Sequence, residues 1–128
     1  MKDETQKWIN FADENYQSAQ ILLHSHLYNP TLQNIQQAFE KYLKALFIEN
    51  GIKLQKTHNI LTLINTLNSH NIEILLDEDI IDLIDSIYIT TKYPFGSVLA
   101  DFEPNETLCK NLLDHLSNLR NDVKRLLK

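Results

Sequence analysis

Apolar residues recur along this chain at steps of three and four, which is the spacing of one face of an α-helix. Five stretches show this pattern, at about residues 3–26, 30–50, 58–69, 77–90 and 105–127. Glycine and proline stand mainly between the stretches, at Pro30, Gly51, Pro94, Gly96 and Pro104. The pattern therefore predicts an all-α fold, an up-and-down bundle of four to five helices in a single domain that covers residues 1–128.

The first stretch is expected to begin near Asp3, because aspartate is a preferred helix cap. Asn15 lies on its apolar face, among residues such as Ala12 and Tyr16. An unsatisfied buried amide costs about 1–3 kcal/mol, so Asn15 needs a hydrogen-bond partner.

The second stretch has the widest apolar arc and is expected to form the central helix. Asn29 and Pro30 match a cap residue followed by proline at the first helical position. The helix should end at Asn50-Gly51, a pair typical of a left-handed C-terminal stop. Helical geometry places a polar stripe opposite the apolar arc, and it carries Gln37, Lys41 and Lys44.

The remaining stretches predict a short third helix, a fourth that begins with acidic residues, and a long fifth helix from Asn105 to Leu127. The β-branched residues between positions 80 and 89 also raise the alternative of a strand. Apolar residues there pair at 80/81, 83/84 and 87/88, a helical rhythm that favours the helix.

Composition narrows the class of protein. The chain has 128 residues, 43% of them hydrophobic and 23% charged, which is not typical of a disordered chain. Its net charge of −5 opposes nonspecific binding to nucleic acid, although a local basic patch remains compatible with it. No apolar run reaches the roughly 18 residues of a membrane span, and the first ten residues do not read as a secretion signal. With Cys109 as its single cysteine, the chain is expected to be cytoplasmic.

Common catalytic and metal-binding motifs are missing from the sequence, including a glycine-rich phosphate loop, His-Glu-x-x-His and Gly-x-Ser-x-Gly. His24 and His26 would point about 200° apart on a helix, so we expect no metal site there and no cofactor. Asp79, Asp82 and Asp85 would form an acidic helix face, which is more simply explained as a solvated surface.

Three blocks of residues together resemble the HEPN family (higher eukaryotes and prokaryotes nucleotide-binding). The first block is Trp8-x3-Ala12 with Asn15-Tyr16-x2-Ala19. The second is the run Gln-Gln-Ala-Phe-Glu-Lys-Tyr-Leu-Lys-Ala at residues 36–45, with His58 beyond the next loop. The third runs from Tyr88 to Lys92-Tyr93-Pro94. The resemblance spans about residues 5–127 and implies the HEPN helical fold.

The resemblance also suggests a ligand site. Lys92 and Tyr93, at the end of the fourth helix with Tyr88, would face the polar stripe of Gln37, Lys41 and Lys44 across a groove. Ammonium groups beside an aromatic face suit a nucleotide phosphate and base, or an RNA segment. In the alternative interpretation, the two stripe lysines solvate a helix face and Tyr93 packs the loop.

Partners follow from the resemblance as well. It implies a HEPN homodimer with a shared cleft, and a minimal nucleotidyltransferase partner protein as found in toxin–antitoxin pairs. Two residues differ from the family pattern. Lys92 replaces the usual arginine, and Asn15 occupies a position where aspartate is common.

Catalysis is left open by the sequence. HEPN ribonucleases carry an arginine followed four to six residues later by a histidine, and no pair in this sequence does so. Arg120 begins such a spacing but meets Arg125, on a different helix from the family motif. The main hypothesis is therefore a nucleotide- or RNA-interacting component of a two-protein system. The alternatives are a metal-independent endoribonuclease toxin and a non-catalytic dimeric interaction subunit.

Overall fold

The computed structural model describes residues 1–92 and 104–128, with side chains described for residues 1–88 and 104–128. Within these residues the chain forms helices and no strand. The helices are α1 (Asp3–His24), α2 (Tyr28–Glu49), α3 (Ile60–Ser69), α4 (Glu78–Lys92) and α5 (Glu106–Leu126). The predicted all-α bundle is confirmed, and the strand alternative for residues 80–89 is wrong.

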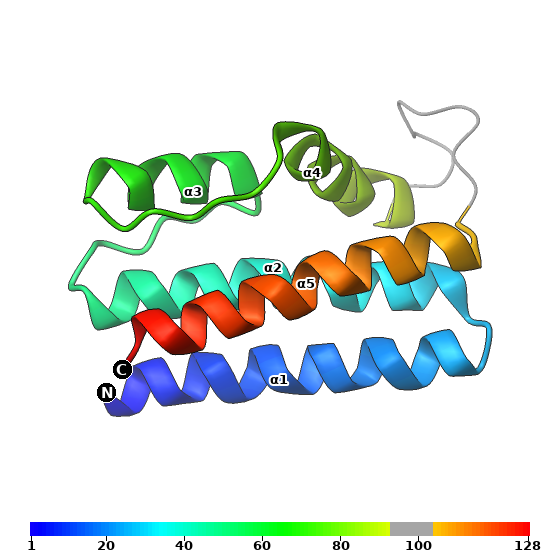
Figure 1. Ribbon diagram of the computed structural model, residues 1–128, viewed down its shortest axis with the longest axis horizontal. Helices are drawn as coiled ribbons and strands as arrows, with labels where there is room; N and C mark the ends of the chain where they lie inside the picture. Colours follow the sequence, from blue (N-terminus) through cyan, green and yellow to red (C-terminus); the bar gives the residue numbers. More distant parts are fainter. Residues whose placement is uncertain (93–103) are drawn as a thin grey trace.

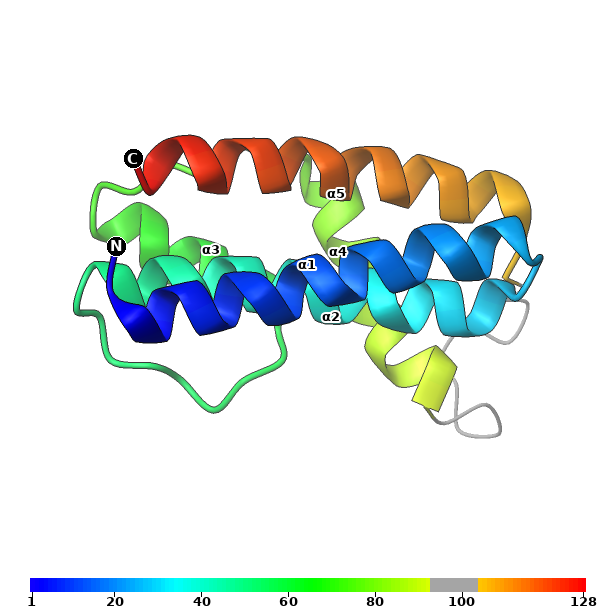
Figure 2. The same cartoon turned by 90° about the horizontal axis from the view of Figure 1, so that it is seen from below.

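The three long helices, α1, α2 and α5, lie side by side along the length of the molecule (Figure 1). α1 and α2 are antiparallel, and α5 returns toward the end of the molecule where both termini lie. The shorter α3 and α4 cover the side of α2 that faces away from α1. Seen from below, α5 lies on one side of α2, and the segment of residues 50–59 lies on the other (Figure 2).

α2 is the central helix, as its wide apolar arc predicted, and it contacts each of the other four helices. Its stripe of Ile35, Phe39, Tyr42 and Leu46 is fully buried. Leu32, Ala38, Leu43, Ala45 and Phe47 are fully buried as well. A helix that is apolar over most of its surface is most stable when other elements surround it. The polar residues of α2 lie on the strip that remains.

Several helix ends follow from local sequence. Asn105 caps α5 by accepting a hydrogen bond from the backbone N–H of Leu108 at 2.8 Å, so the helix begins at Glu106, one residue after the expected start. Gly51 has a φ of +67° just beyond α2. There the N–H of Ile52 donates to the carbonyl of Phe47 at 2.9 Å, which completes the predicted left-handed stop.

Three expected helix starts are wrong by one or two residues. Asp3 is the first helical residue of α1 and not its cap. α2 begins at Tyr28, before Asn29, because Pro30 still lies in the first turn, where backbone amides have no partner within the helix. α3 begins at Ile60 rather than at residue 58, because the side chain of Asn59 caps it.

Candidate functional site on the central helix

A buried carboxylate, that of Glu40 on α2, organises the polar strip of the central helix. Glu40 is only 5% exposed. Its Oε1 accepts a hydrogen bond from Nζ of Lys44 at 2.7 Å, and Lys44 is itself only 7% exposed. Nε2 of Gln36 donates to Oε2 at 3.3 Å. A buried ion pair is tolerable only when its remaining polar atoms are bonded, and here the neighbouring side chains provide those bonds.

His58, in the segment that leads to α3, completes this cluster. Its Nδ1 lies 3.0 Å from Oε1 and 3.1 Å from Oε2 of Glu40. An ionised carboxylate can only accept hydrogen bonds, so Nδ1 of His58 is the donor in this contact and the Nε2 edge of the ring faces away from Glu40. The side chain of His58 is 54% exposed. The arrangement therefore presents a ring of fixed orientation to solvent.

Tyr88 of α4 joins the same cluster through its ring. The rings of Tyr88 and His58 are stacked, with centroids 4.6 Å apart and planes inclined by 15°. Glu40, His58 and Tyr88 thus link α2, the segment before α3, and α4 into one polar and aromatic site. We call these three residues and Lys44 the Glu40 cluster.

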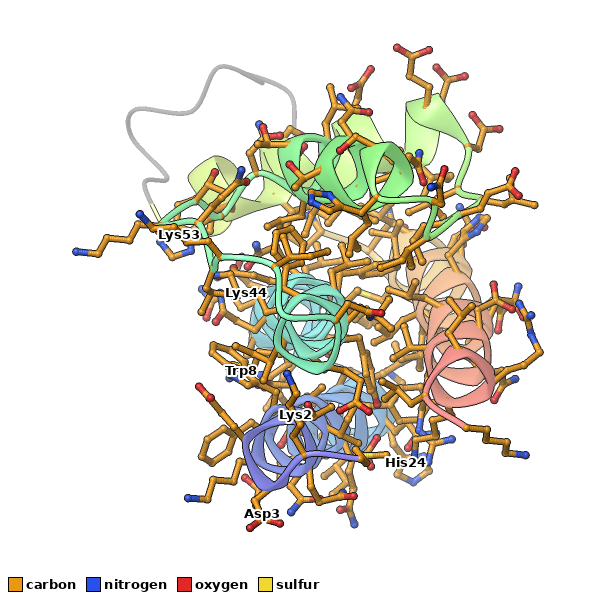
Figure 3. The ribbon with its side chains drawn as sticks, turned by 90° about the vertical axis from the view of Figure 1, so that its left-hand side faces the viewer. Lys2, Asp3, Trp8, His24, Lys44 and Lys53 are labelled. Carbon is orange, nitrogen blue, oxygen red and sulfur yellow. The ribbon has the colours of Figure 1, made fainter. Side chains whose placement is uncertain are left out.

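The strip continues from the Glu40 cluster onto α1. Nζ of Lys44 lies 5.9 Å from the centre of the Trp8 ring, at the distance of a cation–π contact. Trp8 and Lys44 lie along the same edge of the molecule, between α1 and α2, with Lys53 beyond them (Figure 3). Lys41, one turn before Lys44, lies 5.9 Å from the centre of the exposed Phe11 ring.

Lys41 also supplies the partner that Asn15 was expected to need. Its Nζ donates to Oδ1 of Asn15 at 2.7 Å, while Nδ2 of Asn15 donates to Asn34 at 2.9 Å. Burial lowers the pKa of Lys41, against the opposing effect of Glu40 and Glu14. Asn15 therefore positions a partly desolvated ammonium group at the edge of the strip.

The residues named from sequence are only partly placed. Gln37, Lys41 and Lys44 share one strip of α2, where Nε2 of Gln37 donates to Gln36 at 2.7 Å. Tyr88 reaches the same strip through the Glu40 cluster. The alternative interpretation, in which Lys44 solvates a helix face, is wrong, because Lys44 is buried against Glu40.

The other half of the expected groove lies outside the described side chains. Lys92 is the last residue of α4, one turn beyond Tyr88 in the helix, and Tyr93 lies outside the described residues. The groove between Lys92-Tyr93 and α2 stays a prediction.

A model of the HEPN domain matches residues 5–126 of this chain. The chain belongs to the HEPN family. Two solved structures share its fold: TT1696 from Thermus thermophilus and ST0689, an archaeal HEPN homologue. TT1696 has a TM-score of 0.78 and 24% identity, over 97% of this chain and 98% of that one. ST0689 has a TM-score of 0.75 and 22% identity, over the whole of both chains. No curated protein matches the chain.

Sequence reasoning overlooked Glu40 and Trp8 as site residues in this HEPN chain. The sequence does contain a signal for Glu40. Glu40 and Lys44 are four residues apart, and each directly follows an apolar residue, Phe39 and Leu43 respectively. An oppositely charged pair at that spacing, set against an apolar arc, is typical of a half-buried ion pair. Trp8 was named as part of the first HEPN block and not as a site residue.

One acidic residue of α4, Asp85, has a structural role that the sequence did not suggest. Asp85 is half-buried, and its carboxylate accepts hydrogen bonds from the backbone N–H groups of Ile60 at 2.6 Å and Leu61 at 3.2 Å. Burial raises the pKa of Asp85, although these two hydrogen bonds oppose the shift. Asp85 thus caps α3 from a neighbouring helix and does not belong to a solvated acidic face.

The described residues hold no group of three or more His, Cys, Asp or Glu side chains that could bind a metal ion. Cys109 is buried, and burial raises the pKa of its thiol to about 11, as suits a core residue. Among the helices of residues 1–92 and 104–128, none is both long and apolar enough to span a bilayer.

Proposed function

We propose that this HEPN protein binds a nucleotide or an RNA segment at the Glu40 cluster and acts in the cytoplasm as one component of a two-protein system. The observation that carries the proposal is the stacked pair of His58 and Tyr88, which Glu40 joins to Lys44 of α2. Stacking on an aromatic face contributes about 1–3 kcal/mol per base and needs no particular sequence.

The lysines of the site differ in what they offer a phosphate. Lys44 is neutralised by Glu40, so its role is to orient that carboxylate. Lys41 donates one hydrogen bond to Asn15, and an ammonium group has two further protons to donate. Lys92, at the end of α4, is the second proposed phosphate contact. A ligand would thus stack near Tyr88 and place its phosphate between Lys41 and Lys92.

A binding titration tests this arrangement. Fluorescently labelled AMP and a short labelled RNA are titrated against the native protein, Tyr88→Ala and Lys92→Ala, with Lys110→Ala as the control. Lys110 is an exposed lysine of α5 that pairs with Glu106. We expect at least a tenfold loss of affinity in the two site variants and none in the control. Equal binding by all four proteins would show that this site does not contact the ligand.

The proposed partners are a second copy of the chain and a minimal nucleotidyltransferase. Membership of the HEPN family supports both partners. The wide apolar arc of α2 does not add to this support, because it is buried within one chain. Phe11, Ile21, Leu27 and Leu75 remain at least half exposed as candidate contacts. Light scattering at several concentrations tests the dimer, and a strictly monomeric mass would count against it. A nucleotidyltransferase encoded beside this chain, and its co-purification with it, would test the second partner.

A second candidate function is metal-independent RNA cleavage, and the Glu40–His58 contact favours it. Nε2 of His58 would take the proton of an RNA 2′-hydroxyl, whose oxygen attacks the adjacent phosphorus. The bond from phosphorus to the 5′-oxygen breaks, and water protonates the leaving oxygen. Cleavage of RNA but not of 2′-deoxy RNA, without metal, is expected, together with loss in His58→Ala. Intact RNA after prolonged incubation would reject this candidate.

A further inference from the structure

A second polar cluster lies where α1 and α5 meet, and it contains no residue of the Glu40 cluster. Asp13 of α1 stands at its centre. Its Oδ1 accepts a hydrogen bond from the hydroxyl of Tyr42, which is fully buried on α2. Nε of Arg120 donates to the same oxygen at 3.1 Å, and Nζ of Lys124 donates to Oδ2 at 3.2 Å. One carboxylate therefore joins three helices.

The guanidinium group of Arg120 is held from two directions. Its Nε is fixed by Asp13, and its Cζ lies 5.4 Å from the centre of the Tyr16 ring. A guanidinium has five N–H donors, four of them on its terminal nitrogens. The contact to Asp13 uses Nε and the side chain is 35% exposed, so the fork of terminal nitrogens retains donors for a further partner, although Tyr42 also interacts with the guanidinium.

Lys124 places a second cation beside this fork. Arg120 and Lys124 are bonded to the two oxygens of a single carboxylate, so their charged groups lie side by side. Lys124 is 38% exposed and uses one of its three donors on Asp13. Two positive charges against one negative charge leave this cluster with a local charge of about +1, although the whole chain carries −5.

Asp13 and Arg120 each favour the charged form of the other. Burial works against the charge of Asp13, but hydrogen bonds from Tyr42, Lys124 and Arg120 outweigh it and lower the pKa of this carboxyl. Burial likewise opposes the charge of Arg120, and Asp13 outweighs it, so the pKa of Arg120 is raised. The guanidinium of Arg120 therefore keeps its charge at neutral pH.

We propose that Arg120 and Lys124, oriented by Asp13, form a binding site for a phosphate group on the α1–α5 face. A planar guanidinium fork matches two oxygens of a phosphate, and a neighbouring ammonium can bond a third. Gln17, an exposed amide one helical turn from Asp13 on α1, adds a neutral donor at the edge of the site. The phosphate belongs either to a free ion or nucleotide, or to the backbone of a nucleic acid strand.

Thermal unfolding with inorganic phosphate tests the site. The melting temperature is measured against phosphate concentration at constant ionic strength, with chloride as the balancing anion. The variants are Arg120→Gln, Lys124→Gln and Arg120→Lys, and the last keeps the ion pair but loses the fork. Controls are Arg125→Gln and Lys110→Gln, exposed cations of α5 whose partners are Asp122 and Glu106. All variants are first checked for native helicity by circular dichroism.

We expect phosphate to raise the melting temperature of the native protein and both controls along a saturable curve. In Arg120→Gln and Lys124→Gln the apparent affinity for phosphate should fall at least tenfold, and in Arg120→Lys several-fold. An equal response in all variants, or no response beyond that to chloride, would overturn the proposal and leave the cluster as a contact between helices.

Two further ligands identify the source of the phosphate. AMP and a short single-stranded RNA are titrated against the native protein and Arg120→Gln. Arg120-dependent binding of AMP supports a free nucleotide or ion, whereas Arg120-dependent binding of the RNA supports a strand. Loss of ligand binding in the Tyr88 and Lys92 variants tests the Glu40 cluster, whereas loss of the phosphate response in the Arg120 and Lys124 variants tests this site. The two proposals can therefore fail separately.

Discussion

Glu40 lies 3.0 Å from Nδ1 of His58, although 18 residues separate them, and the same carboxylate oxygen lies 2.7 Å from Nζ of Lys44. A single buried side chain therefore pairs a lysine within its own helix and orients a histidine from the next segment. Tyr88 stacks on that histidine from α4. The geometry of the whole site depends on a residue that would not itself contact the proposed ligand.

Replacing Glu40 by alanine should destabilise the protein by about 3 kcal/mol, because removal of one partner from a buried ion pair leaves the other charge uncompensated. Lys44 is the stranded partner, since it remains largely buried. Urea unfolding followed by circular dichroism measures the change. A loss below about 1 kcal/mol would mean that Lys44 escapes to solvent at little cost.

The double variant Glu40→Leu, Lys44→Met is the matched control. It replaces both charges with apolar side chains of similar size, and such replacements are often neutral or stabilising. We expect it to recover most of the lost stability. It should nevertheless bind the labelled RNA more weakly than the native protein does, because Nδ1 of His58 no longer has a partner. A double variant as unstable as Glu40→Ala would contradict the ion-pair explanation.

The helices of this chain were predictable because each has its own periodic pattern, and a pattern within 10 to 22 residues needs no knowledge of the rest of the fold. Helix ends were less certain. Asn105 and Gly51 behaved as their residue types suggest, whereas Asn59 displaced the expected start of α3. Competing cap residues next to each other differ in stability by amounts that sequence alone does not rank.

The sites were harder to predict because they join residues that are distant in sequence. Asp13 and Arg120 are 107 positions apart, and neither stands out within its own helix. Glu40 could have been singled out from its spacing to Lys44, but its contact with His58 required the path of the chain between α2 and α3. Local patterns thus identified polar residues on apolar faces and left their partners open.

Tyr42→Phe should cost about 2 kcal/mol, because hydrogen bonds to charged groups contribute about 1.5–3 kcal/mol and Tyr42 donates to ionised Asp13. The ring itself keeps its fully buried position, so little packing is lost. Burial raises the pKa of Tyr42, with Asp13 adding to the effect, so the hydroxyl stays protonated and able to donate. Urea unfolding at pH 7 measures the loss. The same substitution at the partly exposed Tyr28 is the control and should cost far less.

Asp13 should make stability fall in acid. Its pKa in the folded protein is lowered from the ordinary value of 3.8, so its contribution is complete above that value and is lost as pH falls through the lower folded pKa. Asp13→Asn lacks this contribution at every pH. The difference in unfolding free energy between the native protein and Asp13→Asn should therefore be constant from about pH 7 to pH 5 and shrink below about pH 4. A difference that grows in acid would contradict the lowered pKa of Asp13 in the folded protein.

Asn105 and Asn29, which both lie near helix starts, should respond differently to alanine. Asn105→Ala should cost about 1 kcal/mol, because it removes the side-chain cap that bonds the N–H of Leu108. Asn29→Ala should be nearly neutral, since Asn29 is an exposed residue inside α2 and not its cap. Thermal unfolding of both variants under the same conditions compares them. Equal losses in the two variants would instead support Asn29 as the cap of α2, as the sequence suggested.

Gly51→Ala should destabilise the protein by about 1 kcal/mol for a conformational reason alone. Gly51 has a φ of +67°, and a side chain added there meets no atom within 4 Å. The left-handed conformation costs a residue with a Cβ about 1–2 kcal/mol, while steric overlap contributes nothing here. Gly51→Asn separates the two causes, since asparagine adopts this conformation more readily than alanine although it is larger. Urea unfolding should therefore rank Gly51→Asn between the native protein and Gly51→Ala, and a greater loss in Gly51→Asn would point to crowding instead.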